Sequence, residues 1–245
     1  LMNLTDFDAG QGMPDQDLSV ADRWILSRYQ HAVSEVTRHL ERYDIGEGAR
    51  VLYDFIWSEL CDWYIELVKP RLYGKHGEKA RYASQFTLWY VFRNTMQLLH
   101  PYMPFITEEI WQQLPLAGET IMLAPWPVEK ELKDEAAETE MELLMAVITT
   151  IRTIRSEKQV PPGRKITAIL QADAELGAIL EANVHYLETL AGLASATIEA
   201  PGDKVERSIA AVTNGVEIYL PLADLVDLEA EAKRITNELA RAKQE

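Results

Sequence analysis

The chain has 245 residues, of which 47% are hydrophobic; this is enough to bury a core in one large or two modest domains and excludes a disordered chain. A net charge of −15 argues against tight non-specific binding of nucleic acid, but not against a local basic face. The sequence has no apolar run of the ~18 residues that span a membrane, and no basic-then-apolar leader. With a single cysteine, it predicts a cytoplasmic protein without disulfides, a cysteine-rich zinc site or a membrane partner.

The two ends of the chain predict a piece of a longer protein. Leu1 opens the apolar stretch "LMNL", and the chain stops inside the helical pattern "ELARAKQE". We therefore expect an apolar groove near "LMNL" and Phe7 that a partner covers.

The first helices are predicted from capping residues and apolar spacing. Ser19, with Asp22 three residues later, predicts a capping box for a helix that runs to about Arg42. Asp44 is predicted to cap a second helix over 45–70, whose wide apolar stripe places it at the centre of a bundle. We expect Pro70 and Gly74 to end that helix, and a third helix to cover 79–99.

The stretch "LHPYMPFITEEIWQQL" at 99–114 predicts a corner between two helices. Pro101 disfavours helix at the residue before it, and Pro104 fits the first turn of a new, short helix. The side chains predicted to return to the core are Ile106, Ile110, Trp111 and Leu114.

An alternative for the same stretch is an acid/base site formed by His100, Glu108 and Glu109. Adjacent residues on a helix point about 100° apart, so the two glutamates do not converge. No serine or cysteine nucleophile accompanies them in the sequence. We therefore interpret both glutamates as charges in the first turns of the short helix, where they complement its dipole.

The next predicted elements are a loop over 115–133 and a long helix that begins at residue 134. We expect this helix, over 134–160, to connect onward and to complete the bundle of residues 1–133. Its first part is acidic, and Arg152, Arg155 and Lys158 lie near one face of its last part. These cations either complement the helix dipole or form a basic face for RNA.

Residues 161–224 predict a small α/β unit. "ITAILQA" and "SATIEA" are typical of strands, residues 174–192 of a helix, and "SIAAVTNGVEIYLPL" of a hairpin that turns at Asn214-Gly215. After it, residues 225–245 predict the truncated start of a coiled-coil arm, because apolar residues alternate steps of three and four. The fold class is therefore mainly α: a helical bundle, a small α/β unit and the start of an arm.

The sequence provides no catalytic or metal-ligating constellation. Cys61 lies on the apolar stripe of the second helix, where a buried, inert thiol is the expected state. The five histidines have no metal-ligand spacing with one another or with Cys61. A glycine-rich phosphate loop and a dinucleotide fingerprint are also absent, so we predict no catalytic residue, no metal and no cofactor in this chain.

Two basic clusters remain: the first is either a solvated turn or an RNA-facing patch, and the second either complements a helix end or faces RNA. The second cluster runs from Arg152 to Lys165. Positive patches with interleaved aromatic residues suit RNA, because bases stack on aromatic rings while cations contact phosphates. The first cluster consists of Lys69, Arg71, Lys75, Lys79 and Arg81, with Tyr73 and Tyr82 between them.

Three stretches together carry a family resemblance: "ADRWILSR" (21–28), "YDFIWSELCDWYIELVKPRL" (53–72) and "LLHPYMPFITEEIWQQL" (98–114). They resemble the C-terminal part of class I aminoacyl-tRNA synthetases, and among these the valyl-tRNA synthetase family, over essentially the whole chain. The resemblance implies an anticodon-binding helical bundle, a small mixed domain and the beginning of a coiled-coil arm. Isoleucyl and leucyl enzymes share the bundle, so a structural scaffold from one of these, without RNA contact, is the alternative.

The resemblance also implies partners and a division of labour. The parent would be a valine–tRNA ligase of protein biosynthesis that uses ATP, with tRNA (valine isoacceptors) and its own catalytic domain as partners of this region. The HIGH and KMSKS-type signatures and the editing domain are absent from this sequence, so the chain alone should be inactive. The residues that the resemblance and the basic clusters nominate for tRNA are Arg50, Ile65, Lys69 and Arg71, and then Arg152, Arg155 and Lys158.

Overall fold

The computed structural model describes residues 6–14, 16–115 and 118–225. The chain divides into two compact units, residues 1–141 and 142–245. The boundary lies inside the long helix α6 (Glu135–Glu157). The first turns of α6 therefore belong to the first unit, and the rest of this helix belongs to the second unit.

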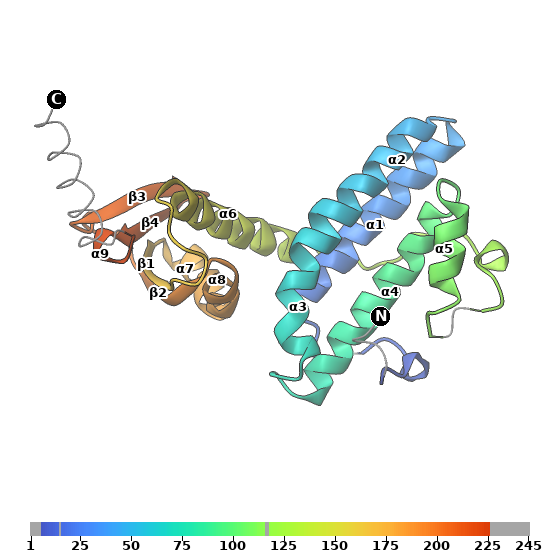
Figure 1. Cartoon of the computed structure of the whole chain (residues 1–245), viewed down its shortest axis with the longest axis horizontal. Coiled ribbons are helices and arrows are strands. Elements are labelled where there is room, and N and C mark those ends of the chain that lie inside the picture. Colours follow the sequence, from blue (N-terminus) through green and yellow to red (C-terminus); the bar gives the residue numbers. More distant parts are fainter. Residues whose placement is uncertain (1–5, 15, 116–117, 226–245) are drawn as a thin grey trace, which may run out of the picture. The chain divides into compact units, whose positions relative to one another are not determined.

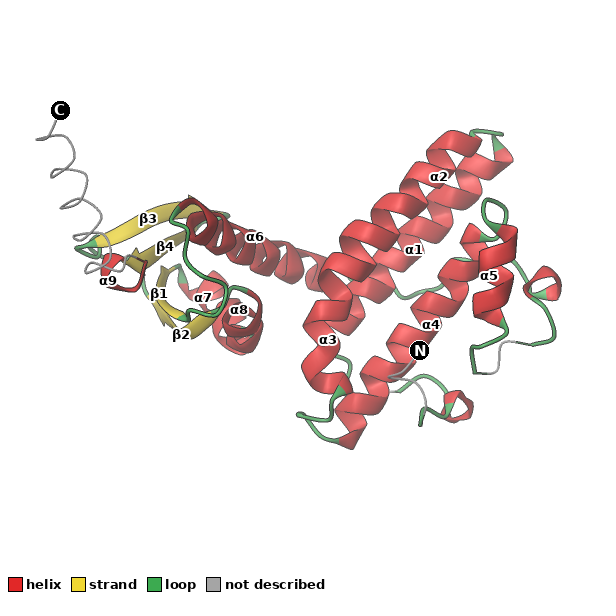
Figure 2. Cartoon of the chain, viewed as in Figure 1, coloured by secondary structure: helices red, strands yellow, loops and turns green. Residues whose placement is uncertain are grey.

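The first unit is built of helices (Figures 1 and 2). The long helix α1 contacts both α2 and α4, and α3 packs on α4. The mainly helical fold predicted for this region is confirmed. Its elements in chain order are η2 (Ala9–Gln11), α1 (Val20–Glu41), α2 (Ile45–Asp54), η3 (Phe55–Tyr64), α3 (Ile65–Leu72), α4 (Glu78–Leu99), α5 (Pro104–Trp111) and η4 (Ile121–Leu123).

Helix α1 begins with the predicted capping box. The Asp22 backbone N–H donates to Ser19 Oγ at 3.1 Å, and the Ser19 N–H donates to the Asp22 carboxylate at 2.9 Å. This reciprocal pair satisfies two of the amides that a helix start leaves without intrahelical partners. The apolar face that follows, with Trp24, Ile25 and Tyr29, is buried in the bundle.

The helix predicted over 45–70 is not one uniform α-helix. Its middle, η3, is a π-helix in which hydrogen bonds span five residues, as between the Ile65 N–H and the Leu60 carbonyl. Phe55, Leu60 and Tyr64 are the buried residues of η3. Their spacing of five and four residues suits the wider π turn better than an α turn, and which residues of the wide apolar stripe are buried depends on the packing of η3 against α1.

The two ends of this segment also correct the sequence predictions. The Asp44 side chain makes no capping hydrogen bond. Pro70 lies inside α3, which continues to Leu72, so the prediction that Pro70 ends the helix was wrong by two residues. Gly74 then turns the chain with a φ of 76°, a backbone conformation that glycine adopts without strain.

The predicted corner is present between α4, which ends at Leu99, and α5, which has Pro104 in its first turn. Trp111 is fully buried and packs with Met96, Leu114 and Ile121. The prediction that Ile106 returns to the core was wrong, because this side chain is 48% exposed.

The second unit contains the rest of α6 and a four-stranded sheet with the strand order β2-β1-β4-β3. Strand β1 pairs parallel to β2 and antiparallel to β4, and β4 pairs antiparallel to β3. Helices α7 and α8 contact β2. The elements are β1 (Ile166–Gln171), α7 (Ala174–Ala182), α8 (Val184–Leu190), β2 (Leu193–Glu199), β3 (Ser208–Thr213), β4 (Val216–Pro221) and α9 (Leu222–Leu225).

Two local features of this unit relate directly to the sequence. Asn214 and Gly215 form the β3–β4 turn with φ angles of 45° and 79°, the left-handed pair that a tight hairpin requires. The single helix expected over 174–192 is instead interrupted at Asn183, whose φ of −117° is not helical. The predicted coiled-coil arm begins at residue 225, and its remaining residues, 226–245, lie outside the described part of the chain.

Candidate nucleic-acid interface

The described residues are 6–14, 16–115 and 118–225. No group of three or more histidine, cysteine, aspartate or glutamate side chains in these ranges has the arrangement of a metal site. Cys61 is half-buried, and burial followed by the nearby Asp62 carboxylate raises the pKa of its thiol. A protonated thiol is a poor nucleophile, as expected for a structural cysteine.

The corner at 99–114 uses its polar groups to hold loops together. His100 Nδ1 lies 2.7 Å from a threonine hydroxyl on α5. Glu108 accepts from Gln112 at 2.5 Å and from Thr120 at 2.8 Å, and the Gln112 hydrogen bond is the main cause that lowers the pKa of Glu108. Glu109 faces a different partner, Gln113. The two glutamates lie beyond the first turn of α5, so the predicted dipole complement was wrong, whereas their lack of convergence is as expected.

An exposed aromatic pair stands on the surface formed by α2, η3 and α3. Tyr53 and Trp57 are 62% and 54% exposed, and their ring centroids lie 6.3 Å apart at an interplanar angle of 52°. Large aromatic side chains usually bury most of their area. Two of them side by side in solvent form a surface on which another flat group can stack.

Cations lie on the same helical segment on either side of this pair. Arg50, one turn before Tyr53, is exposed and pairs with Glu47 at 2.8 Å. Lys69, in α3, pairs with Glu66 at 2.5 Å, and nearly half of its side chain is exposed. Exposed pairs of this kind contribute only about 0–1 kcal/mol, so a phosphate can replace the carboxylate partner. Ile65, between these cations, is partly buried.

Arg71 has a different environment from Arg50 and Lys69. Its side chain is only 15% exposed and lies 3.7 Å from the buried carboxylate of Asp22. Its Nε donates to Ser84 Oγ at 2.9 Å, and its terminal nitrogen donates to the Asp17 carbonyl. Tyr64 donates to the same Asp22 carboxylate at 2.8 Å. This guanidinium therefore joins α3 to α1 and α4, and these contacts occupy donors that the predicted phosphate contact of Arg71 would need.

The three cations nominated for tRNA at the end of α6 also differ in their environments. Arg155 is 8% exposed and donates to the carbonyls of Gly192 at 3.0 Å and Arg164 at 2.9 Å; burial lowers the pKa of this guanidinium. Its role is to hold two loops of the second unit. Arg152 is exposed and donates to the Leu190 carbonyl at 2.8 Å, and Lys158 is exposed.

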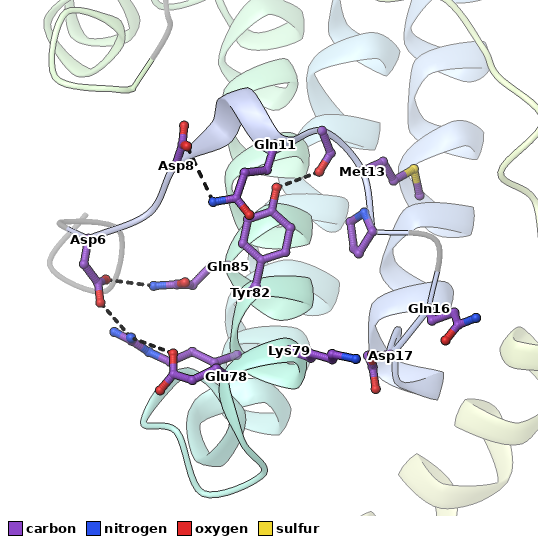
Figure 3. Close-up of a pocket in the computed structure, with 13 residues that line it drawn as sticks. Asp6, Asp8, Gln11, Met13, Gln16, Asp17, Glu78, Lys79, Tyr82 and Gln85 are labelled. Atoms are coloured by element: carbon purple, nitrogen blue, oxygen red, sulfur yellow. Dashed lines mark hydrogen bonds and ion pairs between the residues drawn. The ribbon is translucent and has the colours of Figure 1, made fainter.

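A polar hollow of about 680 Å³ lies beside the start of α4, and Lys79 and Arg81 of the first basic cluster line it. Figure 3 shows Asp6, Asp8, Asp17 and Glu78 around it, together with Lys79 and Tyr82. Arg81 lies 2.6 Å from Asp6, and the Tyr82 hydroxyl donates to the Gly12 carbonyl at 2.7 Å. These contacts fasten residues 6–14 to α4, and the carboxylates offset the positive charge there.

Tyr53 and Trp57 were not among the residues that the sequence nominated for a candidate interface. The available signal was that both fall outside the apolar stripe predicted for this segment, four residues apart. Aromatic residues off the buried face, next to a cation, identify an exposed stacking surface.

Comparison with known proteins gives the class of this molecule. Residues 22–170 match the family model of the anticodon-binding domain of tRNA ligase. The chain belongs to this family, and the resemblance noted in its sequence is confirmed.

Particular relatives carry the name valine–tRNA ligase. The protein of Carboxydothermus hydrogenoformans is 46% identical over 98% of this chain and 27% of its own length. The protein of Geobacillus kaustophilus is 43% identical over 98% of this chain and 27% of its own length. The protein of Bacillus cereus is 41% identical over 96% of this chain and 27% of its own length. The chain thus spans about a quarter of the length of these curated relatives.

Proposed function

We propose that this chain recognises the anticodon region of a tRNA, of the valine isoacceptors, as part of a valine–tRNA ligase. The observation that carries the proposal is the exposed pair Tyr53 and Trp57, which exposed Arg50 precedes and exposed Lys69 follows along the chain. It stands in a chain whose family is the anticodon-binding domain of tRNA ligases.

The physical basis is the way in which single-stranded RNA loops are bound. Unpaired bases stack on aromatic side chains, at about 1–3 kcal/mol per base, while nearby cations neutralise phosphates. Tyr53 and Trp57 provide the stacking surface, and Arg50 and Lys69 provide the cations. Ile65 adds apolar contact beside Lys69. The net charge of −15 disfavours general RNA affinity, so that binding depends on local cations.

The parent activity follows as the second part of the proposal. In the parent, valine is attached to its tRNA with ATP in the cytoplasm, on the catalytic domain that is a partner of this region. This chain contributes recognition, and we predict no valine activation by it alone. Among its described residues, no helix is long and apolar enough to cross a membrane.

A structural scaffold without RNA contact is the alternative. It is favoured by Arg71 and Arg155, two nominated cations whose donors bind groups of the chain itself. The exposed pair of aromatic rings distinguishes the two functions, because a scaffold gains nothing from exposing them.

Titration of the 245-residue chain with tRNA at low and moderate salt tests the proposal. Trp57→Ala should weaken binding at every salt concentration, because a stacking contact is lost. Lys69→Ala should weaken binding and lower the slope of log affinity against log salt by about one phosphate. Lys204→Ala, which removes an exposed cation of the second unit, is the matched control. Unchanged affinity and slope in both Trp57→Ala and Lys69→Ala would show that the RNA lies elsewhere.

A further inference from the structure

A second cavity, of about 530 Å³, lies in the first unit between α1, α4 and the loop at 125–130. Its walls are aromatic and include Tyr29, Phe86, Trp89, Tyr90 and Trp126. The volume falls within the roughly 300–1,000 Å³ of small-molecule sites. The aromatic walls offer flat faces for a ring to stack on, and the function proposed above makes no use of this cavity.

Two cations line the cavity, and each lies over aromatic rings. The Lys130 ammonium is 5.2 Å from the Tyr90 ring centroid. The Arg93 guanidinium carbon is 5.8 Å from the Trp89 ring and 4.5 Å from the Trp111 ring. No aspartate or glutamate is among the described residues that line this cavity. Although the chain has a net charge of −15, these two cations without a lining carboxylate make the electrostatic potential of the cavity favourable for an anion.

Two hydrogen-bonding atoms of residues that line the cavity have no partner among the described residues. Gln97 is 6% exposed, and its Nε2 donates to the Pro125 carbonyl at 2.9 Å. Within the described part of the chain, Gln97 Oε1 and Arg93 Nε have no hydrogen-bond partner. A buried polar atom without a partner destabilises the folded state, because it has lost its hydrogen bonds to water. A ligand that brings a donor to Gln97 and an acceptor to Arg93 removes that destabilisation.

We propose that this cavity binds one nucleotide, with its base between Trp126 and the aromatic side chains of α4 and its phosphate at Arg93 and Lys130. A nucleotide combines a flat ring, hydrogen-bond donors and acceptors on the ring edge, and an anion. The flat ring suits the aromatic walls, the ring-edge donors and acceptors suit the polar atoms without partners, and the anion suits the two cations. The same chemistry can come from a free nucleotide or from an unpaired nucleotide of an RNA strand, and only the RNA case rests on the proposed function.

Isothermal titration calorimetry on the 245-residue chain tests this proposal with two kinds of probe. The first is each of the four nucleoside 5′-monophosphates, and the second is tRNA. Inorganic phosphate and the dipeptide aspartyl-phenylalanine serve as comparison ligands. The variants are Lys130→Met, Arg93→Met, Arg93→Lys and Trp126→Leu. Lys204→Met is the matched control, because it removes one exposed cation of the second unit.

We expect Lys130→Met and Trp126→Leu to weaken binding by at least about fivefold. Arg93→Met should weaken binding by about tenfold, which corresponds to about 1.4 kcal/mol. Arg93→Lys should recover part of the loss, and Lys204→Met should bind as the unaltered chain does. Tryptophan fluorescence during thermal unfolding checks that each variant is folded. Arg93 also contacts the buried Trp111, so Lys130→Met and Trp126→Leu decide the outcome if Arg93→Met fails to fold.

The results separate the two ligand sources and the two proposals. Saturable binding of a monophosphate that the cavity variants weaken supports a free nucleotide. Binding of tRNA alone, weakened by the same variants, supports an RNA nucleotide. Binding of tRNA that Trp57→Ala weakens and the cavity variants do not overturns the cavity proposal and leaves the proposed function standing. Binding of only the dipeptide, or of no nucleotide in any form, also overturns the cavity proposal.

Discussion

The two ends of the segment formed by α2, η3 and α3 carry similar residues in opposite environments. At the first end, Arg50, Tyr53 and Trp57 are exposed, and Arg50 has only helix-surface carboxylates as partners. At the other end, Arg71 and Tyr64 converge on the buried carboxylate of Asp22. The first end has groups available to another molecule, whereas Arg71 and Tyr64 at the second end hold helices together beside the exposed Lys69. Whether an arginine is available to another molecule or is bound within its own fold thus depends on what the neighbouring helix presents to it.

The largest expected effect is a loss of folding stability when the buried contacts around Asp22 are removed. Asp22→Ala removes the acceptor of Tyr64 and the capping partner of Ser19, and leaves Arg71 without its buried counter-charge. Loss of one partner of a buried pair costs about 3–5 kcal/mol. Urea unfolding followed by tryptophan fluorescence measures it, since all six tryptophans of the chain lie in the first unit.

The control for this prediction is Asp54→Ala on the exposed end, where the partner Arg50 is in solvent. We expect a change in the free energy of unfolding below about 0.5 kcal/mol. Equal effects of the two substitutions would show that the contrast between the two ends is wrong.

The next largest effect concerns the same contrast in the second unit. Arg155→Met removes the guanidinium donor from the carbonyls of Gly192 and Arg164, of which Gly192 keeps only the Ile166 N–H at 3.4 Å. Arg152→Ala removes an exposed side chain that donates to the Leu190 carbonyl. We expect about 2–3 kcal/mol of destabilisation for Arg155→Met and less than about 1 kcal/mol for Arg152→Ala. Amide hydrogen exchange of β1 and β2 is the measurement. Equal protection in the two variants would contradict the structural role of Arg155.

A smaller effect tests how closely α2 packs against Tyr102. A Cβ on Gly48 of α2 would lie within van der Waals overlap of the Tyr102 hydroxyl. This hydroxyl is buried and has no hydrogen-bond partner among the described residues. Gly48→Ala should therefore destabilise by about 1–2 kcal/mol, the overlap outweighing the better helix propensity of alanine.

Tyr102→Phe supplies the control for Gly48→Ala. It removes the overlapping atom together with its unsatisfied polar group, so alone it should be neutral or stabilising. In the double variant, most of the cost of Gly48→Ala should disappear. Additive effects in this cycle would mean that the two side chains are not in contact.

Much of the fold follows from sequence patterns that act locally. The Ser19–Asp22 capping box, the corner at Pro104 and the Asn214-Gly215 turn each depend on residues a few positions apart, and all three are present. The π-helix and the break at Asn183 were missed because apolar spacing within one segment does not reveal how neighbouring elements pack. Arg71 and Arg155 were nominated for tRNA for the same reason: their partners lie 49 and 37 residues away, at Asp22 and Gly192.

The smallest effect concerns a carboxylate that anchors β1 of the second unit. Asp224 accepts from the Thr167 hydroxyl at 2.5 Å and from the Thr167 backbone N–H at 2.8 Å. These hydrogen bonds, the hydroxyl first, hold the pKa of Asp224 below its ordinary value of 3.8. A carboxylate with a lowered pKa in the folded state binds fewer protons there than in the unfolded chain. Its contribution is therefore fully present above the unfolded-state pKa and is lost as pH falls through the folded-state value.

Asp224→Asn should accordingly reduce the stability of the second unit by up to about 1 kcal/mol at neutral pH. The difference between variant and unaltered chain should shrink below about pH 4, where the aspartate of the unaltered chain begins to protonate in the unfolded state. Hydrogen exchange of the Thr167 amide at pH 7 and pH 3 reads this out. Asp224 accepts hydrogen bonds from its own fold, as Arg71 donates them, but its side chain is also partly exposed to solvent. A loss that stays the same at both pH values would place its role in shape rather than in charge.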